Sequence, residues 1–372
     1  MRILIVGGTR FVGRHITEAA IAAGHKVALL HRGRTGPELF PEAEHLRADR
    51  DADLSILRDR EWDATIDVSA YLPSQIDSLA EVLSTGQYVF VSSTAVYLPP
   101  KAPNFTEDSP SAEIDGPVPR EVTAETYGAL KALCERTAME RFGPGTLVVR
   151  PTYVIGPYDY TGRFTYWVNR IARGGDVLAP GDPSDPIQVI DGRDMAAWIV
   201  SMTEKAHAVR QAPPADGAEP AGGTGADAQA EVGAGGETGV GAGAQAGAGA
   251  GGETGAGVFH AVSPAPPFSF GDMLEAIMAE VGPPGTTLTW VGQDFLLAEG
   301  ENGRSLPLWS EGDAWAAANT ANPAAAQAAG LTPRPLSRSV REIRESEASF
   351  SVEGTITPAQ EADLLARWRS RS

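Results

Sequence analysis

The stretch that decides the fold is Met1-Arg-Ile-Leu-Ile-Val-Gly-Gly-Thr-Arg-Phe-Val-Gly13. Its continuous apolar run at 3–6 is typical of a strand that is buried on both faces of a parallel sheet. Helical spacing of apolar residues follows from His15 to Ala23 and ends at Gly24. A strand that enters a helix through a glycine turn predicts a dinucleotide site, because the backbone N–H groups of the turn can hold a pyrophosphate.

Four more apolar runs, at 27–30, 64–68, 88–91 and 146–149, alternate with helical stretches. This alternation predicts an α/β protein with a Rossmann-type, doubly wound parallel sheet and a smaller C-terminal substrate lobe. We expect residues 1–205 to form the dinucleotide-binding domain with the catalytic residues, 150–200 lying partly on the substrate side. Residues 258–372 are expected to form the substrate lobe and C-terminal helices.

The segment between these parts is almost entirely Gly, Ala, Glu, Thr and Pro, and it explains much of the total of 42 glycines. Its large apolar residues are Val232 and Val240, so it cannot bury enough surface to offset its ordering entropy. We therefore predict a disordered Gly/Ala-rich insertion over 210–257.

The composition argues against several kinds of binding partner and site. Lys and Arg total 30 against 48 Asp and Glu, a formal charge of −18, which argues against binding to phosphate backbones. The single Cys134 excludes an internal disulfide and a four-cysteine metal site. His15, His25 and His45 show no ligand spacing, and no apolar run reaches the ~18 residues of a membrane span. We expect a cytoplasmic protein that acts on a small molecule, without a metal, a nucleic acid or a membrane as partner.

The end of the second strand bears on the choice of dinucleotide. NAD sites usually place an acidic residue there, whereas this chain has His31-Arg32-Gly33-Arg34. Because arginine pairs with a 2′-phosphate, and Arg10 replaces a glycine of the turn, NADP(H) is favoured over NAD(H). The alternative is that Arg32 and Arg34 form a solvated loop. In the first half of the chain we expect the cofactor to contact Gly7, Thr9, Arg10, Phe11, Val12, Gly13, Arg32, Asp49, Arg50, Ala70 and Lys131. Asp49 and Arg50 either contact adenine or pair with each other.

A second chemical signal is Tyr127-Gly-Ala-Leu-Lys131, whose tyrosine and lysine lie on one helix face. A nearby ammonium lowers the pKa of a tyrosine and suits it to acid–base chemistry. Upstream, the strand at 88–91 runs into Ser92, Ser93 and Thr94, where a hydroxyl can reach a ligand beyond the strand end. The alternatives are a surface tyrosine stacked on a lysine, and hydroxyls that cap a turn.

The glycine turn, Ser92-Ser-x-x-Val-Tyr97, Tyr127-x-x-x-Lys131 and Arg150-Pro-Thr-Tyr-Val-Ile-Gly-Pro157 follow one another in the order found in extended short-chain dehydrogenases/reductases. The chain resembles this NAD-dependent epimerase/dehydratase family over most of residues 1–205. The resemblance implies that Ser93, Tyr127 and Lys131 are catalytic, with Thr94 as helper. It also implies that the segment containing Arg150, Pro151, Tyr153 and Val154 approaches the nicotinamide and substrate.

Two departures refine this expectation. Arg10 in the turn resembles an atypical branch that includes chloroplast stem-loop RNA-binding proteins. Thr94-Ala95 stand where dehydratases of the family carry Asp-Glu, which disfavours a dehydratase because elimination needs an acid and a base. On the substrate side we expect Thr94, Tyr153, Arg163, Gln188 and Arg193, the alternative for Arg193 being a pair with Asp191 or Asp194.

The sequence thus predicts an NAD(P)-dependent epimerase or reductase that acts at a carbinol or keto carbon of a sugar or nucleotide-sugar-like substrate. The alternative is an NADP-binding sensor or scaffold, or an RNA-binding member of the atypical branch, without catalysis. A homodimer is possible, since extended members often pair through two long helices.

Overall fold

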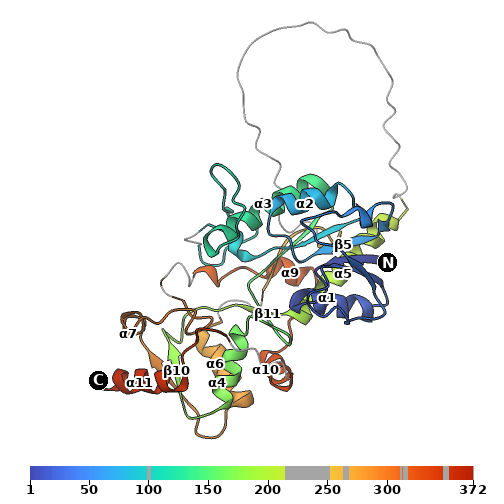
Figure 1. Ribbon diagram of the computed structural model, residues 1–372. Coiled ribbons are helices and arrows are strands. Elements are labelled where there is room, and N and C mark those ends of the chain that lie inside the picture. The colour runs from blue at the N-terminus through green and yellow to red at the C-terminus, as the bar shows by residue number, and fades with distance from the viewer. Residues whose placement is uncertain are drawn as a thin grey trace, which may run out of the picture.

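The computed structural model describes residues 1–98, 102–213, 252–262, 268–310, 312, 317–346 and 352–371. Its centre is a seven-stranded sheet in the order β12-β8-β7-β5-β1-β2-β3 (Figure 1), and every neighbouring pair is parallel. In chain order the strands are β1 (Arg2–Val6), β2 (Lys26–His31), β3 (Glu44–Arg47), β5 (Ala64–Asp67), β7 (Tyr88–Val91), β8 (Leu147–Pro151) and β12 (Gly257–Ala261). The predicted doubly wound α/β fold is confirmed.

Helices cover both faces of this sheet because alternate strand residues are apolar on both sides. Ile3 and Ile5 of β1 pack into the core beneath α1 and α5, whereas Leu4 and Val6 pack beneath α2 and α3. These helices are α1 (Phe11–Ala22), α2 (Pro73–Ala80), α3 (Ala124–Phe142) and α5 (Gly192–Gln211). The side chains on both faces of β1 are buried, as the apolar run at 3–6 predicts.

The strand order reverses at β1, from which the chain winds outward on one side to β2 and β3 and on the other to β5, β7 and β8. Ligands of such sheets bind beyond the carboxyl ends of the strands at this reversal. The turns after β1, β2, β5 and β7 therefore converge where the sequence places its glycine turn and its serines.

A smaller C-terminal lobe lies beside the sheet (Figure 1) and has its own apolar core. It contains α4 (Arg163–Ala172), α6 (Phe270–Val281), α7 (Gln293–Ala298), α10 (Leu336–Glu345) and α11 (Pro358–Arg369), with β10 (Asp176–Pro180) paired in parallel to β13 (Thr287–Val291). Two further parallel pairs are β9 (Tyr153–Ile155) with β11 (Val189–Asp191) and β4 (Glu61–Trp62) with β6 (Ser84–Thr85), and α9 (Ala324–Ala328) packs on β12.

The boundary between the two parts differs from the expected one at 258. Residues 257–261 form β12, which pairs with β8 and closes the edge of the sheet, so the chain after the Gly/Ala-rich segment first returns to the dinucleotide-binding part. Most of that predicted insertion, 214–251, lies outside the described residues, and its first residues continue α5 to Gln211. None of the described helices has the length and hydropathy of a membrane span.

Candidate active site

The turn after β1 forms the floor of a first cavity of about 510 Å³. Gly7 has a φ of +92°, a left-handed conformation that favours glycine. A Cβ on Gly13 would lie 2.1 Å from the carbonyl oxygen of Gly7, so only glycine lets α1 approach β1 this closely. Thr9, Phe11 and Val12 line the same cavity. The turn is therefore shaped to expose backbone N–H groups at the N-terminus of α1.

Arginines surround this first cavity. Arg10, Arg32 and Arg34 line it, together with Asp49. The guanidinium of Arg10 lies flat on the ring of Tyr160, 3.4 Å from its centre. These cations provide charge for phosphate groups at two places, the turn after β1 and the loop after β2.

Arg50 also borders the first cavity, but its guanidinium is held by other groups. It donates to both carboxylate oxygens of Asp67, at 2.8 and 2.9 Å, and to the Ser69 hydroxyl at 2.9 Å. Arg50 holds the pKa of the fully buried Asp67 carboxyl below its usual value, although burial alone would raise that pKa. Arg50 thus pairs with Asp67 beneath the cavity, rather than with Asp49.

A second cavity of about 490 Å³ contains Ser93, Tyr127 and Lys131 together. Tyr127 lies in the second turn of α3, whose N-terminus is capped by Thr123, and Ser93 caps the short 3-10 turn after β7. The Ser93 side chain lies close enough to the Tyr127 hydroxyl to act on its pKa. Gly128 makes this approach possible, because a Cβ there would lie 2.2 Å from the carbonyl oxygen of Ala95.

The pKa values of Tyr127 and Lys131 are shifted in opposite directions. Burial raises the pKa of Tyr127 to about 12, while Ser93 and Arg163 act in the opposite direction. The expected lowering of this tyrosine pKa by Lys131 is therefore not what the structure has. Burial lowers the pKa of Lys131 to about 8, and its Nζ donates to the carbonyl oxygens of Ala70 (2.9 Å) and Val91 (2.8 Å). At neutral pH both groups are protonated, so Tyr127 can donate a proton and Lys131 carries a positive charge.

The other residues predicted to contact the nicotinamide or substrate divide into two groups. Pro151, Tyr153, Val154, Thr94 and Arg163 all line the second cavity. Ala70, by contrast, is fully buried and lines neither cavity, and its carbonyl holds Lys131. Arg150 points into the interior, where it pairs with Glu135 and donates to the Tyr97 hydroxyl. Arg150 therefore braces α3 against β8 and does not face the cavity.

Gln188 and Arg193 lie away from both cavities, which corrects their expected substrate contacts. The Gln188 side chain is buried and exchanges two 2.8 Å hydrogen bonds with the backbone of Ala321. Arg193 pairs with Asp191 at 2.6 Å and with Glu342 of α10, so the expected alternative, a pair with Asp191, holds. Both side chains fix the C-terminal lobe to the sheet domain.

Several cavity residues were missed by sequence reasoning. Tyr71 and Tyr160 border both cavities, and Ala318 and Asn319 close the second one from the C-terminal segment. No pattern identifies Asn319, which is brought there by Gln188 through Ala321. Tyr160 had a signal, since Tyr158-Asp-Tyr160 follows the Arg-Pro segment directly in the sequence.

The cavities fit a nicotinamide dinucleotide on one independent observation. The hydroxyls of Ser92 and Thr152 line the second cavity, are buried, and have no hydrogen-bond partner among the described residues. Buried hydroxyls are normally hydrogen-bonded, so these two are candidates to bind a polar group of a ligand in the cavity that Lys131 also lines. Among the described residues, no three His, Cys, Asp or Glu side chains gather where they could hold a metal ion.

Part of the chain matches a known family. Residues 64–213 match the NAD dependent epimerase/dehydratase family. The chain is 25% identical over 227 residues to the chloroplast stem-loop binding protein of 41 kDa b from Arabidopsis thaliana, covering 56% of this chain and 57% of that protein. It is 30% identical over 200 residues to the isoflavone reductase homolog IRL of Zea mays, covering 54% and 60%. The chain thus matches somewhat more than half the length of these relatives.

Solved structures share the fold. The UDP-glucose 4-epimerase of Thermotoga maritima superposes with a TM-score of 0.58 at 13% identity, over 93% of this chain and 98% of that one. A human epimerase family protein with bound NADPH gives 0.56 at 18%, over 93% and 99%. The match over residues 64–213 and the shared fold relate this chain to the NAD dependent epimerase/dehydratase family.

Proposed function

We propose that the protein is an NADP(H)-dependent reductase or epimerase that acts at a carbinol or keto carbon of a sugar-like or nucleotide-sugar-like substrate. The observation that carries this proposal is the shared cavity of Ser93, Tyr127 and Lys131, which adjoins the glycine turn through Phe11 and Val12. A bound nicotinamide supplies the hydride donor or acceptor. The turn and arginines of the first cavity would hold the dinucleotide, and Ser92, Thr152 and Lys131 its nicotinamide end.

Each side chain has a distinct task in the proton transfer. The Tyr127 hydroxyl gives its proton to the substrate oxygen during reduction and takes it back during oxidation. Ser93, which lines the same cavity as Tyr127, orients the same oxygen. We assign Lys131 to the nicotinamide end of the cofactor, because Ser93 and Arg163 are the groups that counteract the rise in the pKa of Tyr127.

The preference for NADP(H) rests on charge. Arg10, Arg32 and Arg34 line the first cavity, and His31 stands where NAD sites usually carry a carboxylate. Burial lowers the pKa of His31, as does the neighbouring His45, whose Nδ1 lies 2.8 Å from its Nε2. A neutral imidazole flanked by arginines accepts a 2′-phosphate without repulsion.

The residues at the end of β7 argue against a dehydratase. Elimination of water needs an acid and a base beside the reacting carbon. At the end of β7, Ser93, Thr94 and Ala95 line the second cavity and supply hydroxyls but no carboxylate. The stem-loop binding relative suggests RNA binding as another function. The chain has 48 Asp and Glu against 30 Lys and Arg, and this negative net charge does not favour binding to a phosphate backbone.

Replacing Tyr127 by Phe tests the proposal. The variant keeps the ring and the packing but loses the proton, so turnover of NADPH with a carbonyl substrate should fall by a factor of about 10²–10⁴. Dinucleotide binding, followed by the fluorescence of reduced nicotinamide, should stay unchanged. A Tyr127→Phe protein with full turnover would refute the proposed role. Dinucleotide binding without turnover in the wild type, over a broad panel of sugars and ketones, would favour a sensor.

A further inference from the structure

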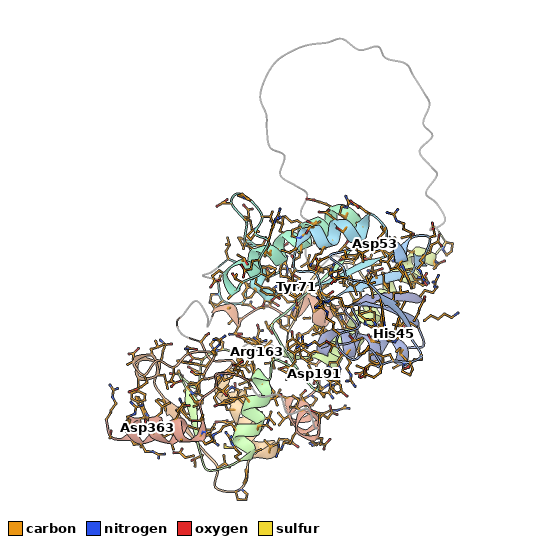
Figure 2. All side chains as sticks on the ribbon, viewed as in Figure 1. His45, Asp53, Tyr71, Arg163, Asp191 and Asp363 are labelled. Atoms are coloured by element: carbon orange, nitrogen blue, oxygen red, sulfur yellow. The ribbon has the colours of Figure 1, made fainter. Side chains whose placement is uncertain are left out.

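The side chain of Arg163 brings a positive charge into the second cavity. Arg163 is the first residue of α4 and lines this cavity with Ser93 and Tyr127, although α4 belongs to the C-terminal lobe. Figure 2 shows Arg163 where the two lobes meet, on the side of the sheet domain that carries Tyr71. Arg163 and Tyr127 line the same cavity, and the charge of Arg163 counteracts the rise in the pKa of Tyr127.

Arg163 is held in position without being neutralised. Its Nε donates to the Thr161 hydroxyl at 3.3 Å, and its guanidinium carbon lies 4.8 Å from the centre of the Tyr153 ring. Within the described part of the chain, no carboxylate lies at ion-pair distance from it. The carboxylate nearby, that of Asp159, is buried and accepts hydrogen bonds from the Thr161 backbone (2.9 Å) and hydroxyl (2.7 Å).

Other arginines at the contact between the lobes are paired. Arg193 binds Asp191 and Glu342, and Arg334 binds Asp194. Each of these guanidiniums serves to hold the lobes together. Arg163 differs because it lines the second cavity and has no carboxylate at ion-pair distance among the described residues, so its guanidinium is available as a planar fork for an oxyanion.

Resting on the function proposed above, we propose that Arg163 binds a carboxylate of the substrate, so that the enzyme acts on keto or hydroxy acids, sugar acids included. The carboxylate matches the planar fork of a single guanidinium with two parallel hydrogen bonds. The charged pyrophosphate and the bulk of a nucleotide-sugar call for further cations. The other cation of this cavity, Lys131, already donates to two backbone carbonyls.

This binding mode also orders the substrate relative to the reacting group. The carboxylate end lies at α4, and the carbonyl or carbinol oxygen lies at Ser93 and Tyr127 on the opposite lobe. A substrate held at both ends bridges the two lobes. A neutral analogue of the same shape keeps the contact with Ser93 and Tyr127 but loses the ion pair with Arg163.

The test is calorimetric binding to the wild-type protein saturated with NADP⁺. The probes are keto acids and uronic acids, each paired with its neutral amide, and UDP-glucose. We expect acids to bind more tightly than their amides, and Arg163→Met to weaken acid binding by about 10- to 100-fold, with amide binding unchanged. Arg163→Lys should retain part of the affinity. The matched control is Arg173→Met, an arginine just beyond α4 that borders a different cavity, and it should change nothing.

The outcomes separate the two proposals. Equal binding of acids and amides, equal loss of both in Arg163→Met, or preferential binding of UDP-glucose would overturn the carboxylate subsite while the NADP-dependent reaction stands. Failure of the wild type to bind either dinucleotide would overturn the proposed function, and with it this inference.

Discussion

The close contact between Gly128 and the turn after β7 gives a sharp prediction for Gly128→Ala. The new Cβ would lie 2.2 Å from the carbonyl oxygen of Ala95, whereas real Cβ atoms keep at least 3.0 Å from such neighbours. Either α3 or the turn must move by about 0.8 Å. Because Gly128 follows Tyr127 directly and the turn begins at Ser93, the movement separates the two catalytic hydroxyls.

Two effects on stability oppose each other in this variant. Alanine stabilises a helix by about 1 kcal/mol relative to glycine. Overpacking against a backbone carbonyl costs about 1–3 kcal/mol. We expect the clash to win, with a net loss of about 1–2 kcal/mol in the free energy of unfolding. Since a misplacement of about 1 Å can cost about 10²-fold, turnover should fall by a similar factor.

Urea unfolding and NADPH-oxidation kinetics measure both effects, and NADPH affinity serves as an internal check. That affinity should change little, because the turn after β1 is built by other elements. Gly145→Ala is the matched control, since nothing lies within 4 Å of its new Cβ, and it should stay within about 0.5 kcal/mol of the wild type. A Gly128→Ala protein that is more stable than the wild type and fully active would show that the close contact of α3 with the turn is not required.

Three further variants test other parts of the site. Arg10→Ala removes the charge that lies on Tyr160. In fluorescence titrations it should weaken NADPH binding about tenfold more than NADH binding. Equal weakening of the binding of both dinucleotides would place Arg10 away from the 2′-phosphate. Asp67→Asn leaves Arg50 buried without its partner and should cost about 3–5 kcal/mol in urea unfolding, so a loss below ~1 kcal/mol would count against the buried pair. Burial lowers the pKa of Lys131 from an ordinary 10.5 to about 8, so burying the charged lysine disfavours folding. Between about pH 8 and pH 10.5 the folded protein has lost this proton while the unfolded chain keeps it. The free energy of unfolding should therefore rise by about 3 kcal/mol over this range. In Lys131→Met that increment should vanish, and an identical pH profile in both proteins would contradict the burial of the charge.

The fold could be predicted because its signals are local. The strands at 3–6 and 88–91 are continuous apolar runs, and both become fully covered strands. Glycines at 7 and 13 mark a turn whose backbone geometry needs them. The pair Tyr127 and Lys131 is set by helical periodicity, so its placement on one face of α3 follows from spacing alone.

The rest depends on contacts that are distant in the sequence. Gln188 and Arg193 resembled ligand residues because they are polar near strand ends, yet their partners Ala321 and Glu342 lie more than a hundred residues away. The pKa of Tyr127 depends on its burial, which spacing does not reveal. Asn319 lines the cavity from a segment whose neighbour Ala321 is hydrogen-bonded to the distant Gln188.

The measurement that tests the central claim most directly is a titration of the wild-type protein with NADPH and NADH, followed by the fluorescence of the reduced nicotinamide. The two adjoining cavities and the arginines of the first predict saturable binding of one dinucleotide per chain, with NADPH bound more tightly than NADH. Gly13→Val, which fills the turn, should abolish it. No saturable binding of either dinucleotide to the wild type, or undiminished binding to Gly13→Val, would contradict the account.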